Sequence, residues 1–427
     1  MRKKSVRTGW MLIIAFSVLI CGSTGIFINP GHAEDKKTEQ KQDNTYDQIK
    51  LLLDILTFTK DNYVEDVDTQ KLIYSAAAGM LRPLDPFSQF MEPESYKEMK
   101  VETEGKYGGL GIRISIRDSW LIVITPLPGT PAYRAGIVPE DKIIKIENES
   151  TYGITIEEAV NKLRGDPGTN VKITIAREGA KEPVEFTLTR EIIKIETLSS
   201  KMVTPEIGYI HLYEFNANAE VDTRKAINDL KAQGMKSLVF DLRYNPGGLL
   251  NIAIDVVKLF LGDKKLIVYT QGRVQQKKEY FADQTAVFPD LPVIVLINNG
   301  SASASEILSG ALQDHKRALV VGMKSFGKAS VQTVIPMQNG AGLRLTTAKY
   351  YTPSGRLIQR DEKDKQKGGI DPDIKIEVKP EIEAKVRQQE EKIYPPGKEP
   401  VSTQKDQVED VTLQRAVEFL KVRSIFK

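Results

Sequence analysis

The chain has 427 residues, of which 41% are hydrophobic and 27% are charged, so it can build two or three domains with separate cores. Four basic residues and no acid lie in the first 33 positions, and the remainder holds 56 Lys and Arg against 57 Asp and Glu. Residues 34–427 are therefore almost neutral, and their charge gives no reason to expect nucleic acid as a partner. With one cysteine, Cys21, and three histidines, the composition argues against disulfides, thiol nucleophiles and metal sites, and we expect no cofactor.

The first 33 residues have the layout of a secretory signal. A basic segment, Arg2–Arg7, precedes the apolar run Trp10–Ile20, and Gly31-His-Ala33 offers small residues for cleavage. Weakly apolar residues continue to Ile28, so an uncleaved membrane anchor is the alternative. We therefore expect an exported protein, in the periplasm or on the extracytoplasmic face of the cytoplasmic membrane, with membrane association left open.

Residues 34–100 are predicted to form an N-terminal helical region after a polar leader. Apolar residues recur at helical spacing between Tyr46 and Met80, which predicts two or three helices. The segment Leu84–Phe90 contains a proline and should end them. We expect these helices to serve in packing or dimerisation.

Residues 101–190 change to short strands separated by turn residues, which predicts a β-rich module. Strands are expected near residues 105–114, 120–124, 142–146 and 171–175, with one short helix over Ile156–Leu163. From 191 to 378 strands and helices alternate, which predicts an α/β core. Its buried strands are expected over 208–213, 237–243, 292–298 and 318–322, and its helices over 219–233, 249–261 and 303–313. Residues 379–427 form a charged tail that closes with an amphipathic segment, Leu413–Phe426.

Ser303 is the first candidate catalytic residue. It lies where a buried strand should turn into a helix, and free backbone N–H groups at such a turn can stabilise an oxyanion. Ser303 and Glu306 also fit the capping-box spacing, so Ser303 could serve only as a helix cap. On its own, the spacing favours the cap.

Lys328 is the second candidate, because it stands between Gly327 and Ala329 in a largely apolar stretch. Burial would lower its pKa toward neutrality, and a neutral lysine can take the proton of a serine hydroxyl. Gln332 could orient it by hydrogen bonding. Residues 322–328 also match the start of a phosphate-binding loop, but Ala329 lacks the required hydroxyl and a strand, not a helix, should follow.

Three motifs together resemble the carboxyl-terminal processing, or tail-specific, proteases. They are Gly-Ser-Ala-Ser-Ala-Ser-Glu-Ile (300–307), Phe-Gly-Lys-x-Ser-Val-Gln (326–332) and Asp-Leu-Arg-x-Asn-Pro-Gly-Gly (241–248), within a similarity that spans about 46–378. The resemblance implies a crotonase-like ββα core in which Ser303 is the nucleophile, Lys328 the general base and Gln332 its partner. It implies backbone oxyanion donors at Ala304 and at Gly247 or Gly248. Two positions depart from the family pattern: Met323 replaces a frequent Glu, and Ala329 a usual Gly.

The resemblance also implies a PDZ domain over 101–190. The loop formed by Gly109, Leu110, Gly111 and Ile112 resembles the one that binds a terminal carboxylate, and the segments 131–136 and 141–146 resemble the rest of such a domain. Arg164 could couple peptide binding to the core, or be an ordinary surface arginine.

The sequence thus predicts a multidomain α+β protein with N-terminal helices, a PDZ module, an α/β protease core and a helical tail. Its expected activity is that of an exported serine endopeptidase that acts on polypeptides with apolar C-termini through an acyl-enzyme, and the resemblance implies a homodimer. Two alternatives stay open. One is a non-catalytic PDZ adaptor, and the other is a Ser-His-Asp hydrolase that uses His211 or His315, although no G-x-S-x-G motif surrounds Ser303.

Overall fold

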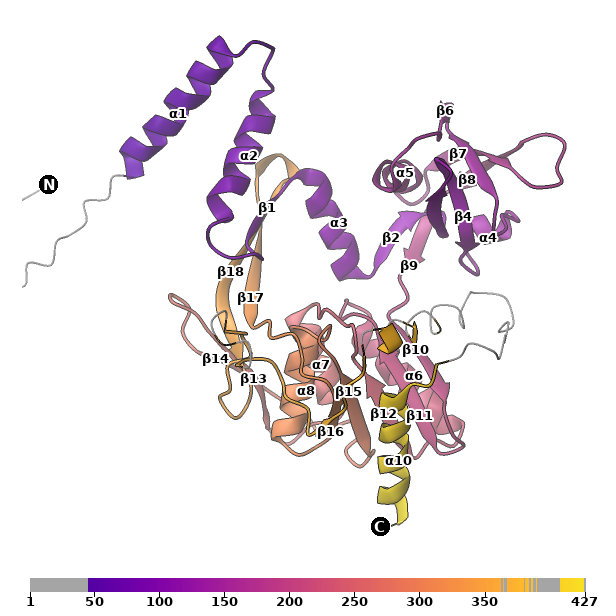
Figure 1. Cartoon of the computed structure of the whole chain (residues 1–427), viewed down its shortest axis with the longest axis vertical. Helices are drawn as coiled ribbons and strands as arrows, with labels where there is room; N and C mark the ends of the chain where they lie inside the picture. The colour runs from indigo at the N-terminus through magenta and orange to yellow at the C-terminus, as the bar shows by residue number, and fades with distance from the viewer. Residues whose placement is uncertain are drawn as a thin grey trace, which may run out of the picture. The chain divides into compact units, whose positions relative to one another are not determined.

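A computed structural model describes residues 45–361 and 408–425, with 364, 367–379, 381–383, 385–386 and 389 between them. Figure 1 traces the chain. The expected signal or anchor over 1–33 lies outside the described residues. Within the described part, no helix is both long enough and apolar enough to cross a membrane.

The described residues up to Thr69 belong to one unit and those from Gln70 onward to another. The described part of the first unit is mainly helix α1 (Thr45–Asn62), which buries none of its side chains. Large apolar residues of this helix are therefore exposed, among them Ile49, Leu52 and Phe58.

The second unit opens with α2 (Thr69–Leu81), the short strand β1 (Gln89–Met91) and α3 (Pro93–Glu104). The sequence did not predict α3 because its only buried residue is Tyr96, so it lacks an apolar stripe. The helix ends at Gly105, whose φ of 66° suits a glycine.

The β-rich module contains one six-stranded sheet with the order β3-β4-β5-β7-β8 and β6 paired to β5. A separate pair joins β2 to β9. The module also has the short helices α4 (Pro131–Arg134) and α5 (Ile156–Leu163). Its strands are β2 (Lys106–Gly109), β3 (Ile112–Arg117), β4 (Trp120–Pro126), β5 (Lys142–Ile146), β6 (Glu149–Ser150), β7 (Asn170–Ala176), β8 (Val184–Thr189) and β9 (Glu191–Lys194). Apolar side chains from β4, β5, β7 and α5 form its core.

The α/β core is built on a six-stranded sheet with the order β10-β11-β12-β15-β16-β19. All its neighbours pair parallel except β10 and β11. The strands are β10 (Leu198–Met202), β11 (Ile207–Leu212), β12 (Ser237–Asp241), β15 (Val293–Ile297), β16 (Leu319–Gly322) and β19 (Ile374–Lys375). The helices are α6 (Ala219–Ala232), α7 (Leu250–Lys258), α8 (Ala304–Asp314) and α10 (Val411–Ile425).

Helices cover both faces of this sheet. One face packs its buried residues, such as Phe240 and Val295, against α6, α7 and α8. The other face packs Val239, Leu296 and their neighbours against Ala416 and Leu420 of α10 (Figure 1). Because every residue of β12 and β15 is buried, these strands are continuous apolar runs, as expected for parallel strands covered on both sides.

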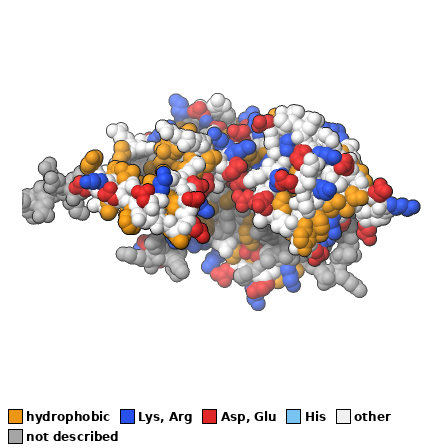
Figure 2. All heavy atoms as spheres, turned by 90° about the horizontal axis from the view of Figure 1, so that it is seen from above, with side chains coloured by type: hydrophobic (Ala, Val, Ile, Leu, Met, Phe, Trp, Pro, Cys, Tyr) orange, Lys and Arg blue, Asp and Glu red, His pale blue; other side chains and the backbone are white. Residues whose placement is uncertain are grey.

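A second sheet, with the order β1-β18-β13-β14 and β17 paired to β18, extends from the core. Its further members are β13 (Leu266–Gln271), β14 (Lys278–Phe281), β17 (Ser330–Pro336) and β18 (Gly342–Tyr351), with the 3-10 turn η1 (Gln338–Gly340) between the last two. β1 pairs antiparallel with β18 through Gln89 and Arg344. The predicted fold class is confirmed: helices and sheets are combined in a multidomain chain. On the face that Figure 2 displays, Lys and Arg side chains are interspersed with Asp, Glu and apolar side chains.

Candidate active site

Ser303 lies on a sharp turn between β15 and α8. Its φ of 53° and ψ of −111° differ from the extended conformation of an ordinary N-cap. Thr155, which caps α5, shows the ordinary geometry, with φ of −77° and ψ of 159°. The Ser303 residue is only 5% exposed. The Ser303 N–H donates to the Glu306 side chain at 2.8 Å, as in a capping box, but the backbone of Ser303 is not that of an ordinary N-cap.

The backbone N–H groups of Ala304, Gly247 and Gly248 are the predicted oxyanion donors. In the described part of the chain, the N–H groups of Ala304 and Gly248 have no hydrogen-bond partner. A Cβ atom on Gly247 would lie 2.8 Å from the Ser303 Cβ and 2.9 Å from the Ala304 nitrogen. The turn at Gly247 and Gly248 (the glycine turn) therefore packs directly on the turn at Ser303 (the serine turn). The N–H of Gly247 itself donates to Asn245 Oδ1 at 2.9 Å, which leaves Gly248 as the available donor.

Lys328 is half-buried in the loop that precedes β17. Its Nζ lies 3.4 Å from Gln332 Oε1 and 4.5 Å from the centroid of the Phe87 ring. Burial lowers the pKa of Lys328, and the positive charge of Arg344 lowers it further, whereas Glu306 and Asp85 act in the opposite direction. The direction of this shift is the one that a general base at neutral pH requires.

The Glu306 side chain joins the serine turn to the loop that carries Lys328 and precedes β17 (the lysine loop). Its Oε2 accepts hydrogen bonds from the N–H of Ser303 and of Lys328, each at 2.8 Å. Its Oε1 accepts from the Gly327 N–H at 2.6 Å and from the Ser325 hydroxyl at 2.5 Å. The residue is fully buried, and burial raises its pKa to about 7 although all four donors lower it. The sequence indicated only a capping role for this residue.

No hydrogen bond joins Ser303 to Lys328 in this structure. The Ser303 side chain interacts with the buried hydroxyl of Tyr350, which partly offsets the rise in the Tyr350 pKa that burial causes. Lys328 instead contacts Gln332 and Phe87. The two predicted reacting groups therefore have different side-chain partners in this structure. Ala329 has no positive φ, so this position does not require glycine here.

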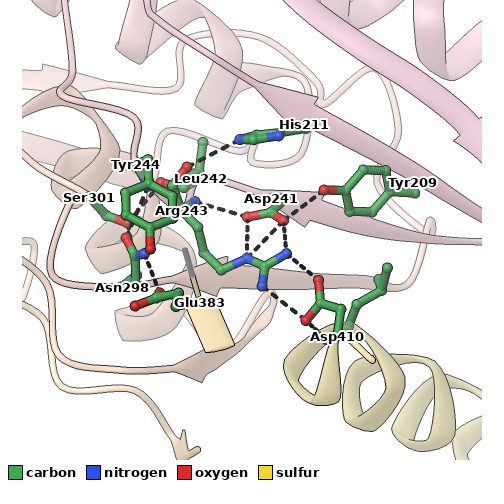
Figure 3. Close-up of polar contacts among 11 residues, drawn as sticks. Tyr209, His211, Asp241, Leu242, Arg243, Tyr244, Asn298, Ser301, Glu383 and Asp410 are labelled. Atoms are coloured by element: carbon green, nitrogen blue, oxygen red, sulfur yellow. Dashed lines mark hydrogen bonds and ion pairs between the residues drawn. The ribbon is translucent and has the colours of Figure 1, made fainter. Parts of the chain in front are cut away.

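A buried ion cluster lies at the carboxyl end of β12, just before the glycine turn (Figure 3). Arg243 donates to both carboxylate oxygens of Asp241 and to both of Asp410, which directly precedes α10. Tyr209 donates to Asp241 at 2.8 Å. Burial alone would raise the pKa of Asp241, but the charges of Arg243 and His211 and the hydrogen bonds from Arg243 together outweigh it, and the pKa is lowered. The cluster thus fastens the tail segment to the strand that leads into the active site.

Neighbouring hydrogen bonds hold the two loops that carry the site (Figure 3). Asn298 Oδ1 accepts from the N–H groups of Tyr244 and Gly300, and Asn298 Nδ2 donates to Glu383 at 2.6 Å. The Ser301 hydroxyl donates to the Leu242 carbonyl at 2.7 Å. These hydrogen bonds therefore join the loop that leads into the glycine turn to the loop that leads into the serine turn.

The two histidines of the described chain contact backbone carbonyls. His211 Nε2 lies 3.1 Å from the carbonyl oxygen of Arg243 (Figure 3), and His315 Nε2 lies 2.7 Å from that of Leu266. Neither contact involves Ser303. In the described residues no cluster of His, Cys, Asp or Glu is able to hold a metal ion.

The predicted peptide-binding loop lies between β2 and β3 of the β-rich module, with Gly109 at the end of one strand and Ile112 at the start of the other. Among the described residues, the N–H groups of Leu110 and Gly111 have no hydrogen-bond partner, as a carboxylate-binding loop requires. Beside them is a small cavity of about 60 Å³, lined by Tyr107, Leu110, Gly111, Ile112, Ile114, Val160, Leu163 and Arg164. The guanidinium of Arg164 lies 4.4 Å from the centroid of the Tyr107 ring.

Comparison with protein families gives three matches along the chain. Residues 206–376 match peptidase family S41, and residues 122–177 match the PDZ domain. Residues 21–95 match the activating protease CtpB N-terminal domain. The first match contains Ser303 and Lys328, and the second lies within the β-rich module.

Several curated proteins are similar over most of the chain. The carboxy-terminal-processing protease of Bartonella bacilliformis is 44% identical over 345 residues, which cover 80% of this chain and 77% of that one. The carboxy-terminal processing protease CtpB of Bacillus subtilis is 33% identical over 381 residues, which cover 86% and 77%. Among solved structures, a photosystem II D1 C-terminal processing protease is 29% identical, covers 77% of this chain and 92% of that one, and has a TM-score of 0.44.

Proposed function

Because the chain belongs to the carboxyl-terminal processing serine proteases of peptidase family S41 and carries a PDZ domain, we propose that it cleaves polypeptides with a Ser303–Lys328 dyad. The observation that carries the proposal is the Glu306 carboxylate, which hydrogen-bonds to the backbone on both sides of the dyad. The partner-free N–H groups of Ala304 and Gly248 beside Ser303 support it further.

The proposed reaction begins when neutral Lys328 removes the proton of the Ser303 hydroxyl while the serine oxygen attacks the scissile carbonyl carbon. The N–H groups of Ala304 and Gly248 stabilise the negative oxygen that forms. The tetrahedral intermediate collapses to an acyl-enzyme, and the ammonium of Lys328 returns its proton to the leaving amine. Lys328 then activates a water molecule that hydrolyses the ester. Gln332 orients the lysine through these steps.

We further propose that the PDZ loop over Gly109–Ile112 selects substrates by an apolar C-terminus, with the Leu110 and Gly111 N–H groups binding the terminal carboxylate. The signal-like segment over 1–33 supports export to the extracytoplasmic side of the cytoplasmic membrane. The exposed apolar residues of α1 support a role for that helix in homodimer formation.

The experiment that tests the dyad follows degradation of an unfolded protein with an apolar C-terminal tail. We expect Ser303→Ala and Lys328→Ala each to lower kcat/KM by about 10³-fold or more, while binding of a tail peptide to the PDZ domain is retained. In the wild type, kcat/KM should fall toward acid pH as Lys328 becomes protonated. Cleavage at the wild-type rate by Ser303→Ala would falsify the mechanism.

A further inference from the structure

The segment between α2 and β1 reaches the lysine from a distant part of the sequence. Its turn is fixed by Asp85, whose Oδ1 accepts from the N–H groups of Phe87 and Ser88, each at 2.8 Å. The Ser88 hydroxyl donates to Asp85 Oδ2 at 2.8 Å and accepts from the Thr346 N–H of β18 at 3.0 Å. Phe87 is therefore held in a defined place against the second sheet.

Phe87 contacts both Lys328 and its partner Gln332, through different parts of the residue. Its ring centroid lies 4.5 Å from Lys328 Nζ. Its carbonyl oxygen accepts a hydrogen bond from Gln332 Nε2 at 2.7 Å, and this bond leaves Gln332 Oε1 facing Lys328 Nζ at 3.4 Å. The backbone of Phe87 thus fixes which end of the amide faces the lysine.

An aromatic ring attracts the ammonium form of lysine and has little affinity for the neutral amine. The ring therefore favours the protonated state, which cannot accept the proton of Ser303. The charged groups that face Lys328 are Arg344 on β18, which disfavours the ammonium, and Glu306 and Asp85, which favour it. The Phe87 ring carries no charge, but it favours the ammonium form of Lys328, as Glu306 and Asp85 do.

We propose that Phe87 is a positioning residue that holds Lys328 in its protonated resting state through its ring and orients Gln332 through its carbonyl group. The proposal rests on the proposed function, in which Lys328 is the base. During turnover the lysine must exchange the Phe87 ring for the Ser303 hydroxyl as its partner. Phe87 thereby raises the pH at which the protease becomes active.

The test compares pH profiles of kcat/KM for the full chain and three variants. Phe87→Leu keeps an apolar side chain and the backbone carbonyl but removes the π face, so the acid limb should move to lower pH by about half to one unit. Phe87→Tyr keeps the ring face, and its acid limb should stay near the wild-type pH. Phe90→Leu is the matched control, because Phe90 lies in the adjoining strand β1 and its ring packs in a tilted arrangement against Tyr74 instead of the lysine.

An unmoved acid limb in Phe87→Leu, or an equal displacement in Phe90→Leu, would overturn the proposal, since either result assigns the segment only a structural role. A second measurement avoids turnover altogether. In the Ser303→Ala background, the pH dependence of Lys328 acetylation by acetic anhydride, followed by mass spectrometry, should show a lower pKa when Phe87→Leu is added, and an unchanged pKa would contradict the proposal. Activity retained by Lys328→Ala would instead refute the dyad, whatever the acetylation result.

Discussion

At the scale of single residues, Glu306 is the group on which the geometry of the site most depends. Four donors from two loops converge on one carboxylate that has no contact with solvent. A hydrogen bond to a charged group contributes about 1.5–3 kcal/mol when both partners are present, and an unsatisfied partner costs a similar amount. The serine turn and the lysine loop should therefore move apart if this acceptor is lost.

The raised pKa of Glu306 predicts a pH dependence of stability. Because folding raises its pKa from 4.5 to about 7, the folded state retains a proton that the unfolded state releases between these values. The free energy of unfolding should then fall by about 3 kcal/mol as pH rises from about 4.5 to 7, from this group alone. Glu306→Gln should remove that slope, as measured by urea unfolding at a series of pH values.

Glu158 provides the matched control for this prediction. It occupies the same N3 position in the capping box of α5, but it is exposed and hydrogen bonds from Thr155 lower its pKa. Glu158→Gln should leave the slope between pH 4.5 and 7 in place. A Glu306→Gln protein with the full wild-type slope would show that another group causes it.

The residues of the site differ in how far the sequence could predict them. Ser303, Lys328 and Gln332 fall within short motifs whose order and spacing can be recognised from the chain alone. Phe87 could not be predicted, because its bond to Gln332 joins residues 245 positions apart. The extended role of Glu306 was missed for the same reason: the capping box accounts for its local contact, and only the folded chain brings the lysine loop to it.

At the scale of elements, local periodicity predicted the buried strands and amphipathic helices well. The short helix over Ile156–Leu163 is confirmed with the same bounds, and β12 and β15 lie within their expected segments. The ten-residue strand β18 was not predicted, because only three of its residues are buried and its place is set by pairing with β1, β13 and β17. Strand register of this kind is a tertiary property.

The junction between α10 and the core sheet predicts a second outcome. Asp410 pairs with buried Arg243 and also caps α10 by accepting from the Leu413 N–H at 3.0 Å. Asp410→Asn keeps the cap but loses the charge, so it should lower the free energy of unfolding by about 2–3 kcal/mol. Asp410→Ala should lower it by roughly 1 kcal/mol more, because it also removes the cap.

Denaturant unfolding measures both variants, with limited proteolysis to report on release of α10. The control is Asp229→Asn, which breaks an exposed pair with Lys225 and should change stability by less than about 0.5 kcal/mol. Equal effects of Asp410→Asn and Asp229→Asn would mean that the buried cluster does not hold the tail.

At the scale of the whole molecule, a PDZ domain and a protease core occupy one chain, and tail recognition can be tested apart from chemistry. Gly111 has a φ of 73°, and a Cβ atom there would lie 2.4 Å from the Thr130 side chain. Gly111→Ala should therefore distort the loop that we propose to bind the terminal carboxylate. We expect it to abolish the preference for a substrate with a free apolar C-terminus over the same substrate with an amidated end.

The measurement is the ratio of kcat/KM for the two substrates, which should fall to about one in Gly111→Ala. Gly153→Ala is the matched control, because Gly153 has a φ of 75° in the same module but open space around it. Both variants carry similar backbone strain, so a comparable loss of preference in both would assign the effect to general destabilisation of the module.

The ion pair between Arg243 and Asp410 also has a consequence for the order in which the parts of the chain are synthesised. The chain is synthesised from its N-terminus, so Ser303 and Lys328 are made before Asp410 and α10, which cover the other face of the core sheet. Until Asp410 and α10 follow, Arg243 has a single carboxylate partner, and Val239 and Leu296 lack the helix that buries them. A chain that has not yet acquired these residues would thus hold Ser303 and Lys328 on a core sheet with one face uncovered. We expect the core sheet to become stable only once Asp410 and α10 have packed against it.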